Sequence, residues 1–463
     1  MKRNVKEIIG SIKRSLFKLL IGLFLGFIFS GSVFAQQTTN KPEREQLFMD
    51  MGFGMFIHWS FDSQVGAVIS HSMAGASADY LDRFVNELPK TFNPKKFDPE
   101  EWAVLAKLAG MKYVVFTTKH HSGFCMWDTK TTGFDVMNTP FKRDITKEIF
   151  DAFRKQGLAI GVYFSPEDFH YLYENKIPIG RLQHPMHFPK NNKGLMELDK
   201  AQLKELLTNY GKIDLIFFDG PEEGLKEYAW ELQPDIIVTR GQMKTPEQEL
   251  PDKPLPGPWE ACFTMGTDWQ YKPTNDPHKS GTEIINMLIE IRAKGGNLLM
   301  NVGPKPNGEL QIEQEARLQE LALWNLMNQE AIHNVRTWNI AKEGNVWFTK
   351  AKDSNTVYAF VQTSKNWPFG ERKEILFKTL QGSEQTKVSI LGYGSELVEY
   401  KEGLDAKIYT DNTKMGLLIS AVNGHRMYTN YQWPNPIVMK IENVTFKALA
   451  ENKEQGIKMD GAK

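Results

Sequence analysis

Polar side chains stand at the ends of several apolar runs, the positions where α/β enzymes gather their reacting groups. His58 ends GMFIHWS, His120 and His121 follow YVVFTT, Asp219 ends IDLIFFDG and Glu260 lies in PGPWEACFT. An ionised Asp at the end of a buried strand needs charged partners or a catalytic task. The alternative explanation for Asp219 is an ordinary Asp-Gly turn.

Two carboxylates from different strands suggest glycoside hydrolysis, in which one attacks the sugar carbon and the other moves a proton. Asp219 and Glu260 form the candidate pair, because Pro258 and Trp259 would exclude water from Glu260 and raise its pKa. A solvent-facing Glu is the ordinary alternative. If Glu260 proved badly placed, the nearest carboxylates in sequence are those of the Glu222-Glu223 pair.

The three histidines admit two interpretations, metal binding or hydrogen bonding to sugar hydroxyls. Neighbouring residues of a strand point to opposite faces, so His120 and His121 can converge only where the strand has turned. The sequence has no HxH, HExxH or CxxC pair to complete a metal site. We therefore expect no metal and no other cofactor, with a metal-dependent hydrolase using His58, His120 and His121 as the competing hypothesis. Purely structural histidines are a third reading.

The elements that would position these residues alternate between strands and helices. Between the apolar runs lie segments with apolar residues three to four apart, as in amphipathic helices. Seven or eight such β-then-α units in about 290 residues predict a (β/α)₈-like barrel. A doubly wound open sheet is the alternative. The predicted strands are 54–59, 113–118, 159–165, 214–219, 235–239, 260–265 and 297–302, and the predicted helices are 100–109, 147–156, 199–210 and 282–294.

The last third of the chain has a different texture. After a predicted long helix over 313–328, short alternating runs are divided by Gly, Asn and Asp, which indicates an all-β region. These runs are 346–349, 356–362, 373–377, 387–390, 416–421 and 437–441. We therefore expect a catalytic domain over 36–340, a β-rich domain over 341–450 and a polar tail over 451–463.

The first 35 residues have the pattern of a secretory signal peptide, with basic residues, the apolar run from Leu19 to Phe29 and a Val-Phe-Ala ending. Cleavage after Ala35 and export to the periplasm or the medium are predicted, with an uncleaved anchor as the alternative. The chain has only two cysteines, Cys125 and Cys262, and a bridge between them stays open.

Charge balance limits the class of partner. The chain has 56 Lys plus Arg and 56 Asp plus Glu, which argues against a nucleic-acid binder or an anionic-membrane binder. The 11 Trp suit the flat apolar faces of sugar rings, although aromatics also fill cores. No Gly-rich phosphate loop follows a predicted strand, so phosphoryl and hydride transfer are disfavoured. A neutral substrate fits best.

Taken together, these residues resemble glycoside hydrolase family 29, the α-L-fucosidases. The resemblance covers most of residues 48–340, and its motifs occur in the order found in the family. They are GFGMFIHWS (52–60), AKLAGMKYVVFTTKHHSGFCMWDTKTT (106–132), YFSPEDFH (163–170), YGKIDLIFFDG (210–220), PWEACFT (258–264) and KGGNLLMNVGPKPNGEL (294–310). The resemblance implies a retaining enzyme with a (β/α)₈-like catalytic domain and a C-terminal β-sandwich, acting on fucosylated oligosaccharides or glycoconjugates.

Carried over residue by residue, the resemblance implies Asp219 as nucleophile, and Glu260 matches the position of the acid/base in many members. His58, His120 and His121 match histidines that line the fucose pocket, and Tyr163, Arg240 and Trp269 are similar to further pocket residues.

The sequence departs from the family in two places. Phe217 stands where many members have Trp, and residues 64–92 lack the usual Glu-Trp-Tyr pattern. An α-L-galactosidase on the same scaffold, or a non-catalytic carbohydrate-binding protein, therefore stays open as an alternative.

Overall fold

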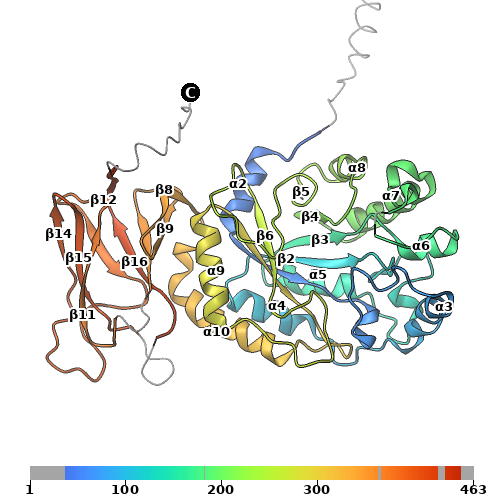
Figure 1. The fold of residues 1–463 in the computed structure, drawn as a ribbon, viewed down its shortest axis with the longest axis horizontal. Helices are drawn as coiled ribbons and strands as arrows, with labels where there is room; N and C mark the ends of the chain where they lie inside the picture. Colours follow the sequence, from blue (N-terminus) through green and yellow to red (C-terminus); the bar gives the residue numbers. More distant parts are fainter. Residues whose placement is uncertain (1–36, 182, 363–366, 426–432, 450–463) are drawn as a thin grey trace, which may run out of the picture. The chain divides into compact units, whose positions relative to one another are not determined.

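The computed structural model describes residues 37–181, 183–362, 367–425 and 433–449 (Figure 1). The predicted signal peptide (1–35) and the predicted polar tail (451–463) both lie outside these residues. None of the helices in these ranges has the length and apolar character that crossing a membrane requires.

Seven parallel strands form the main sheet, and each agrees with a run predicted from the sequence to within a few residues. Their order is β5-β4-β3-β2-β1-β7-β6. The strands β1 to β5 follow one another as neighbours, β6 pairs with β7, and β7 pairs with β1 in parallel. This cyclic order belongs to a barrel, whereas a doubly wound sheet reverses direction at a switch point. The strands are β1 (Phe53–Ile57), β2 (Tyr113–Lys119), β3 (Ala159–Phe164), β4 (Leu215–Phe218), β5 (Ile237–Val238), β6 (Glu260–Thr264) and β7 (Asn297–Val302).

An irregular segment takes the remaining place between β5 and β6. The Met243 N–H donates to the Thr239 carbonyl at 2.7 Å, and the Gln248 N–H donates to the Cys262 carbonyl of β6 at 3.0 Å. The Cys262 N–H in turn donates to the Pro246 carbonyl at 3.0 Å. We call residues 243–248 the closing segment, because it links the two edges of the sheet without forming a regular strand.

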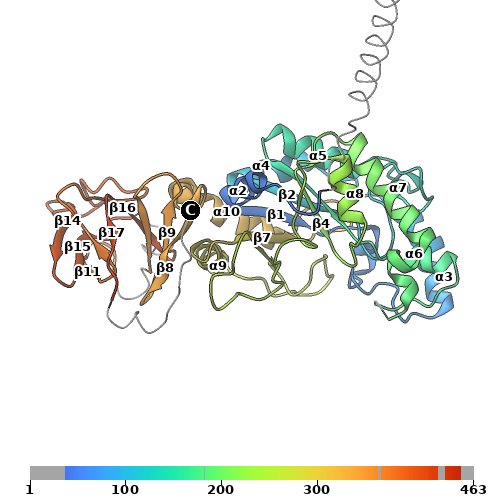
Figure 2. The same ribbon diagram turned by 90° about the horizontal axis from the view of Figure 1, so that it is seen from above.

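Helices surround this sheet (Figures 1 and 2). Their starts follow capping chemistry: the Asp98 side chain accepts from two N–H groups of the first turn of α4, and Ser280 and Glu283 form a capping box on α9. The helices are α2 (Pro42–Met51), α3 (Ala78–Asn86), α4 (Pro99–Leu108), α5 (Ile145–Lys155), α6 (Phe169–Glu174), α7 (Lys193–Asn209), α8 (Leu225–Leu232), α9 (Gly281–Ala293) and α10 (Ile312–Asn328).

The C-terminal region is all-β, as the sequence predicted, and antiparallel. A five-stranded sheet has the order β13-β16-β10-β9-β8, and a three-stranded sheet has the order β11-β15-β14. The rings of Phe348 on β9 and Phe377 on β11 lie 6.0 Å apart, so the two sheets pack as a sandwich. The strands are β8 (Val335–Glu343), β9 (Val346–Ala351), β10 (Val357–Val361), β11 (Arg372–Phe377), β12 (Leu380–Gln381), β13 (Lys387–Ile390), β14 (Tyr409–Thr413), β15 (Gly416–Val422), β16 (Ile437–Glu442) and β17 (Thr445–Phe446). The strand β8 crosses the boundary expected after residue 340.

Candidate active site

A pocket opens where the parallel strands end. Strands of a barrel run in one direction, so side chains that follow β1, β2, β4 and β5 meet at the same end. Six of the residues predicted from the sequence lie here together, namely His58, His120, Tyr163, Asp219, Arg240 and Trp269. The remaining residues that line the pocket are Phe56, Ser70, Phe217, Glu247 and Cys262.

Asp219 is the centre of the polar contacts in this pocket. Its Oδ1 accepts a hydrogen bond from Arg240 Nη1 at 3.1 Å, and its Oδ2 accepts one from Tyr163 Oη at 2.6 Å. His121 Nε2 lies 3.2 Å from the same Oδ2. Burial alone would raise the pKa of the Asp219 carboxyl, but His121, Arg240 and then His120 outweigh it and hold that pKa well below its usual value. Asp219 is therefore an ionised carboxylate at neutral pH.

A chain of hydrogen bonds fixes how His120 supports this carboxylate. The backbone N–H of His121 donates to His120 Nδ1 at 2.9 Å, so the proton of a neutral His120 ring is on Nε2. That nitrogen lies 2.8 Å from Tyr163 Oη and donates to it, and Tyr163 donates in turn to Asp219. Burial, followed by the nearby His121 and His58, lowers the pKa of His120 well below its ordinary value.

His58 has the opposite tautomer. The side-chain amide nitrogen of Asn301 donates to the Trp269 carbonyl at 2.6 Å. The side-chain oxygen of Asn301 therefore faces His58 Nδ1, 2.7 Å away. His58 Nδ1 therefore carries the proton, and Nε2 keeps a lone pair. Burial lowers the pKa of His58 to about 3, so the ring is neutral and can accept a hydrogen bond from a ligand hydroxyl.

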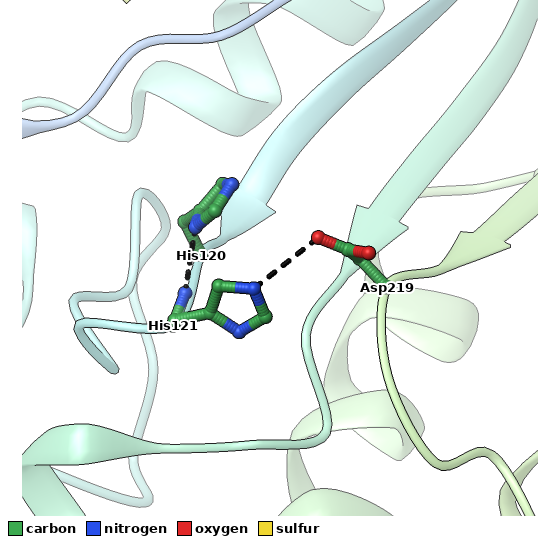
Figure 3. Close-up of side chains that lie close together, drawn as sticks. All are labelled: His120, His121 and Asp219. Carbon is green, nitrogen blue, oxygen red and sulfur yellow. Dashed lines mark hydrogen bonds and ion pairs between the residues drawn. The ribbon is translucent and has the colours of Figure 1, made fainter. Parts of the chain in front are cut away.

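His120 and His121 both reach the site because β2 has ended before them (Figure 3). The register of β2 against β3 shifts between Thr117 and Lys119. Lys119 is fully buried, with its Nζ 2.9 Å from Asp199 and 3.3 Å from Asp168. This ion pair anchors the end of the strand, and the chain then turns. His120 and His121 can therefore converge, because the strand has turned before them, as the sequence analysis required.

His120, His121 and Asp219 could each offer a metal ligand atom, and these atoms lie within 4.8 Å of one another (Figure 3). Both nitrogens of His120 are already hydrogen bonded inside the protein, and the Arg240 cation contacts Asp219. A cation bound here would have to displace the hydrogen bonds of His120, and the positive charge of Arg240 would repel it. The contacts support a hydrogen-bonded carboxylate better than a metal centre.

Glu247 is a second pocket carboxylate, and the sequence did not single it out. Arg240 Nη2 donates to Glu247 Oε2 at 2.9 Å, while Nη1 of the same guanidinium donates to Asp219. Because both carboxylates bind one planar guanidinium, their bound oxygens lie within roughly 8 Å of each other. That range includes the separation of about 5–5.5 Å found in retaining pairs. The Glu247 side chain is 42% exposed, so water reaches it.

Glu260 lies elsewhere. It is the first residue of β6, fully buried, and it accepts a hydrogen bond from Tyr113, the first residue of β2, at 2.5 Å. Asp219 follows the last residue of β4, so the two carboxylates are at opposite ends of the barrel. Cys262 lines the pocket, and Glu260 precedes it by two residues on the same face of β6, about 6–7 Å farther from the pocket.

Burial raises the pKa of Glu260 to about 7, more than Tyr113 and Arg240 lower it. The shift has the direction expected from the sequence, but the position does not support the predicted acid/base role. The structure brings Asp219 together with Glu247 instead. Nothing in the strand pattern marks Glu247, because it lies in the irregular closing segment beside Pro246. The fallback carboxylates of Glu222 and Glu223 do not line the pocket either.

Aromatic rings form one wall of the pocket. Phe56 packs against Phe217 at 5.1 Å and against Trp269 at 5.9 Å between ring centroids, and Arg240 lies 4.5 Å over Phe217. Residues 64–92 contribute Ser70 to the lining. Cys262 and Cys125 are both buried free thiols, so no bridge joins them.

Comparison with known proteins identifies the family of the chain. A family model described as α-L-fucosidase matches residues 31–330. The chain is similar to the plasma α-L-fucosidase of Rattus norvegicus, with 26% identity over 440 residues that cover 85% of this chain and 90% of that protein.

Two solved bacterial structures also resemble it. The α-L-fucosidase isoenzyme 1 from Paenibacillus thiaminolyticus is 28% identical, with a TM-score of 0.69 over 88% of this chain and 99% of that one. An α-L-fucosidase of glycoside hydrolase family 29 from Bacteroides thetaiotaomicron is 25% identical, with a TM-score of 0.68 over 90% and 98%. Since the family model spans more than half of the sequence, the chain belongs to the α-L-fucosidase family of glycoside hydrolases.

Proposed function

We propose that this protein is a retaining exo-α-L-fucosidase in which Asp219 is the nucleophile and Glu247 is the general acid/base. One observation carries the assignment: a single guanidinium, Arg240, binds both carboxylates in a pocket at the catalytic end of the barrel. Retaining glycosidases need two such groups, one always ionised and one that exchanges its proton with leaving group and water. The Asp219 side chain is 22% exposed and ionised, whereas the Glu247 side chain is 42% exposed.

The first half of the reaction forms a covalent intermediate. An oxygen of Asp219 attacks the anomeric carbon, and the bond from that carbon to the aglycone oxygen breaks as Glu247 gives that oxygen its proton. Tyr163, His121 and Arg240 hold the attacking carboxylate in place, which reduces the cost of orienting it.

The second half reverses the roles. The Glu247 carboxylate takes a proton from water as the water oxygen attacks the anomeric carbon, and the bond to Asp219 breaks. Two inversions return the sugar with its original anomeric configuration. Glu247 ends the cycle protonated again by a proton from the water, while its first proton has left with the aglycone.

The pocket supports a terminal monosaccharide as the bound unit. The contacts that its lining offers suit one sugar ring at the end of a chain. Neutral His58 offers the lone pair on its Nε2 to a sugar hydroxyl without adding charge. His120 also lines the pocket, but both of its nitrogens already have protein partners. The wall of Phe56, Phe217 and Trp269 suits an apolar face or methyl group, such as C6 of a 6-deoxy sugar.

A paired hydrolysis assay tests the proposal. We expect turnover of an aryl α-L-fucoside, and turnover of the aryl α-L-galactoside lower by about 10- to 100-fold, because an apolar wall rejects one extra hydroxyl only moderately. Asp219→Asn is the control and should abolish both activities. Turnover of neither substrate, or a preference for the galactoside, would contradict the proposed substrate.

We also propose that residues 1–35 direct export and that the mature chain begins at Gln36, on the support of the basic and apolar pattern of that segment. N-terminal sequencing of the protein recovered outside the cytoplasm tests this. A chain that begins at Met1 and stays with the membrane would contradict it.

A further inference from the structure

Glu167 is a fully buried carboxylate beside the active site that the mechanism above does not use. It lies three residues after the end of β3 and precedes Asp168, the N-cap residue of α6. Its Oε1 lies 3.2 Å from His187 Nδ1, and its Oε2 lies 3.3 Å from Arg181 Nε. A buried carboxylate is tolerated only with such partners.

A third neighbour of Glu167 leads to the nucleophile. His121 Nδ1 is 3.7 Å from Glu167 Oε2, and His121 Nε2 is 3.2 Å from Asp219 Oδ2. The ring is buried and packs beside Phe169 at 5.8 Å between centroids. His121 thus has a carboxylate oxygen within 4 Å of each ring nitrogen, close enough for electrostatic attraction on both sides of the ring.

The other partners of Glu167 belong to the segment between α6 and α7, which borders the pocket. Arg181 Nη1 donates to the carbonyl of Ser70, a pocket residue, at 3.2 Å. The Gly75 N–H donates to the Ile179 carbonyl at 3.0 Å, and His187 Nε2 lies 2.8 Å from the Pro178 carbonyl. One carboxylate therefore contacts both the ring behind the nucleophile and the support of the pocket wall.

We propose that Glu167 is a positioning residue that holds His121 against Asp219 and ties the segment carrying Arg181 to the pocket. The proposal deepens the proposed function, because it names what keeps the nucleophile ready. It rests on that function only for its kinetic test.

A merely structural Glu167 would serve as a counter-ion to Arg181 and leave Asp219 unaffected. The two roles differ in their effect on the Asp219 carboxyl, because burial raises its pKa and His121 is the strongest influence that lowers it. Without Glu167 the His121 ring is held less firmly beside Asp219. His121 then offsets less of the effect of burial, so the pKa of Asp219 should rise. The other groups that face Asp219 are unchanged by this substitution: Tyr163 from β3, His120 after β2, Arg240 after β5 with Glu247 behind it, and His58 after β1.

The test compares Glu167→Gln with Asp144→Asn. Asp144 is also a carboxylate with several hydrogen bonds, to the Lys147 N–H and Tyr210 Oη, but it caps α5 and does not line the pocket. For Glu167→Gln we expect kcat/KM on an aryl α-L-fucoside to fall at least tenfold below pH 5. The acid limb of the pH profile, where kcat/KM falls as Asp219 is protonated, should move to higher pH. Asp144→Asn should lower the Tm and leave the limb in place. A folded Glu167→Gln with an unmoved limb would overturn the proposal.

A second measurement is independent of activity. With ¹³C-labelled aspartate, the Asp219 carboxyl signal is identified by its loss in Asp219→Asn and titrated in wild type and in Glu167→Gln. We expect titration at higher pH in the variant, and equal titration in both would overturn the proposal. If Glu167→Gln does not fold, Glu167→Asp should show a smaller shift in the same direction, and its absence counts equally against the role. Failure of the wild type to cleave fucosides would contradict the proposed function, while the titration would still decide the role of Glu167.

Discussion

At the scale of single residues, the two pocket carboxylates differ in what surrounds them. Asp219 is enclosed by donors from three strand ends, whereas Glu247 meets water on one side and Arg240 on the other. The same guanidinium links them, so Arg240 can balance the pair as charge moves from one to the other. A nucleophile and an acid/base need this division of environments.

Substitution of the two glutamates separates their roles. Glu247→Gln should lower kcat/KM on natural fucosides by about 100-fold or more, because leaving-group protonation is lost. Glu260→Gln should keep kcat/KM within a few-fold of wild type, because its carboxyl is at the other end of the barrel. Steady-state kinetics on a fucosylated oligosaccharide measure both values. Equal losses in the two variants would contradict the assignment of Glu247.

Chelation tests the interpretation of the histidines. Because both nitrogens of His120 already have protein partners, we expect prolonged dialysis against EDTA to leave turnover unchanged. A loss of activity that Zn²⁺ restores would support the metal-dependent alternative. Dialysis without chelator is the control.

At the scale of elements, the closing segment positions Glu247, and the start of β6 positions Glu260 at the floor of the barrel, the end where the parallel strands begin. Glu247 faces the pocket because Pro246 and Gln248 bind the backbone of Cys262 on β6. Glu260 lies at the opposite end because it starts that strand. The hydrogen bond from Tyr113 joins the beginnings of β6 and β2 across the floor.

Glu260 should make stability depend on pH in a predictable direction. Its folded pKa of about 7 exceeds its ordinary value of 4.5, so the protonated acid stabilises the fold below pH 4.5, and this stability is lost as pH rises through 7. Glu260→Gln lacks this loss. Its unfolding free energy relative to that of wild type should therefore rise between pH 5 and pH 8 by at most about 3 kcal/mol, and its relative Tm should rise with it. Thermal melts across that range measure the difference. A constant difference would contradict a raised pKa at this site.

The sequence predicted the elements that carry a strong apolar signal. All seven parallel strands and the helices α4, α5, α7, α9 and α10 were predicted, since each buries one face or both. The strand β8 was missed because its residues are mostly half-exposed and few are strongly apolar. Pocket residues at strand ends were predictable for the same reason that the strands were. Glu247 was not, because an irregular segment with prolines has no periodicity from which to read the direction of a side chain.

At the scale of the whole molecule, α9 and α10 of the barrel contact the β-rich region. The Trp324 indole on α10 is fully buried, donates to the Pro436 carbonyl at 3.2 Å, and stacks on Phe360 of β10 at 6.4 Å. Thr282 of α9 donates to Asn435 at 2.8 Å. These contacts couple the stability of the two regions without reaching the pocket.

Removal of the Trp324 side chain tests this coupling. Trp324→Ala should cost about 3–5 kcal/mol of unfolding free energy, because a buried ring and its hydrogen bond are lost together. The kcat/KM at 25 °C should stay close to that of wild type. Leu326→Ala is the matched control on the same helix, since that side chain is 75% exposed, and it should have little effect. Denaturant unfolding measures the unfolding free energy of both variants. Similar losses of that free energy in Trp324→Ala and Leu326→Ala would contradict the stated contact.

The stereochemistry of azide rescue tests the assignment of Asp219 and Glu247 most directly. With Asp219→Gly and an aryl α-L-fucoside, azide should enter from the vacated face and give the inverted β-fucosyl azide. With Glu247→Ala, the glycosyl ester on Asp219 still forms, and azide should replace it to give the retained α-fucosyl azide. Inverted azide from both variants, or retained azide from Glu260→Ala with no rescue of Glu247→Ala, would contradict the account.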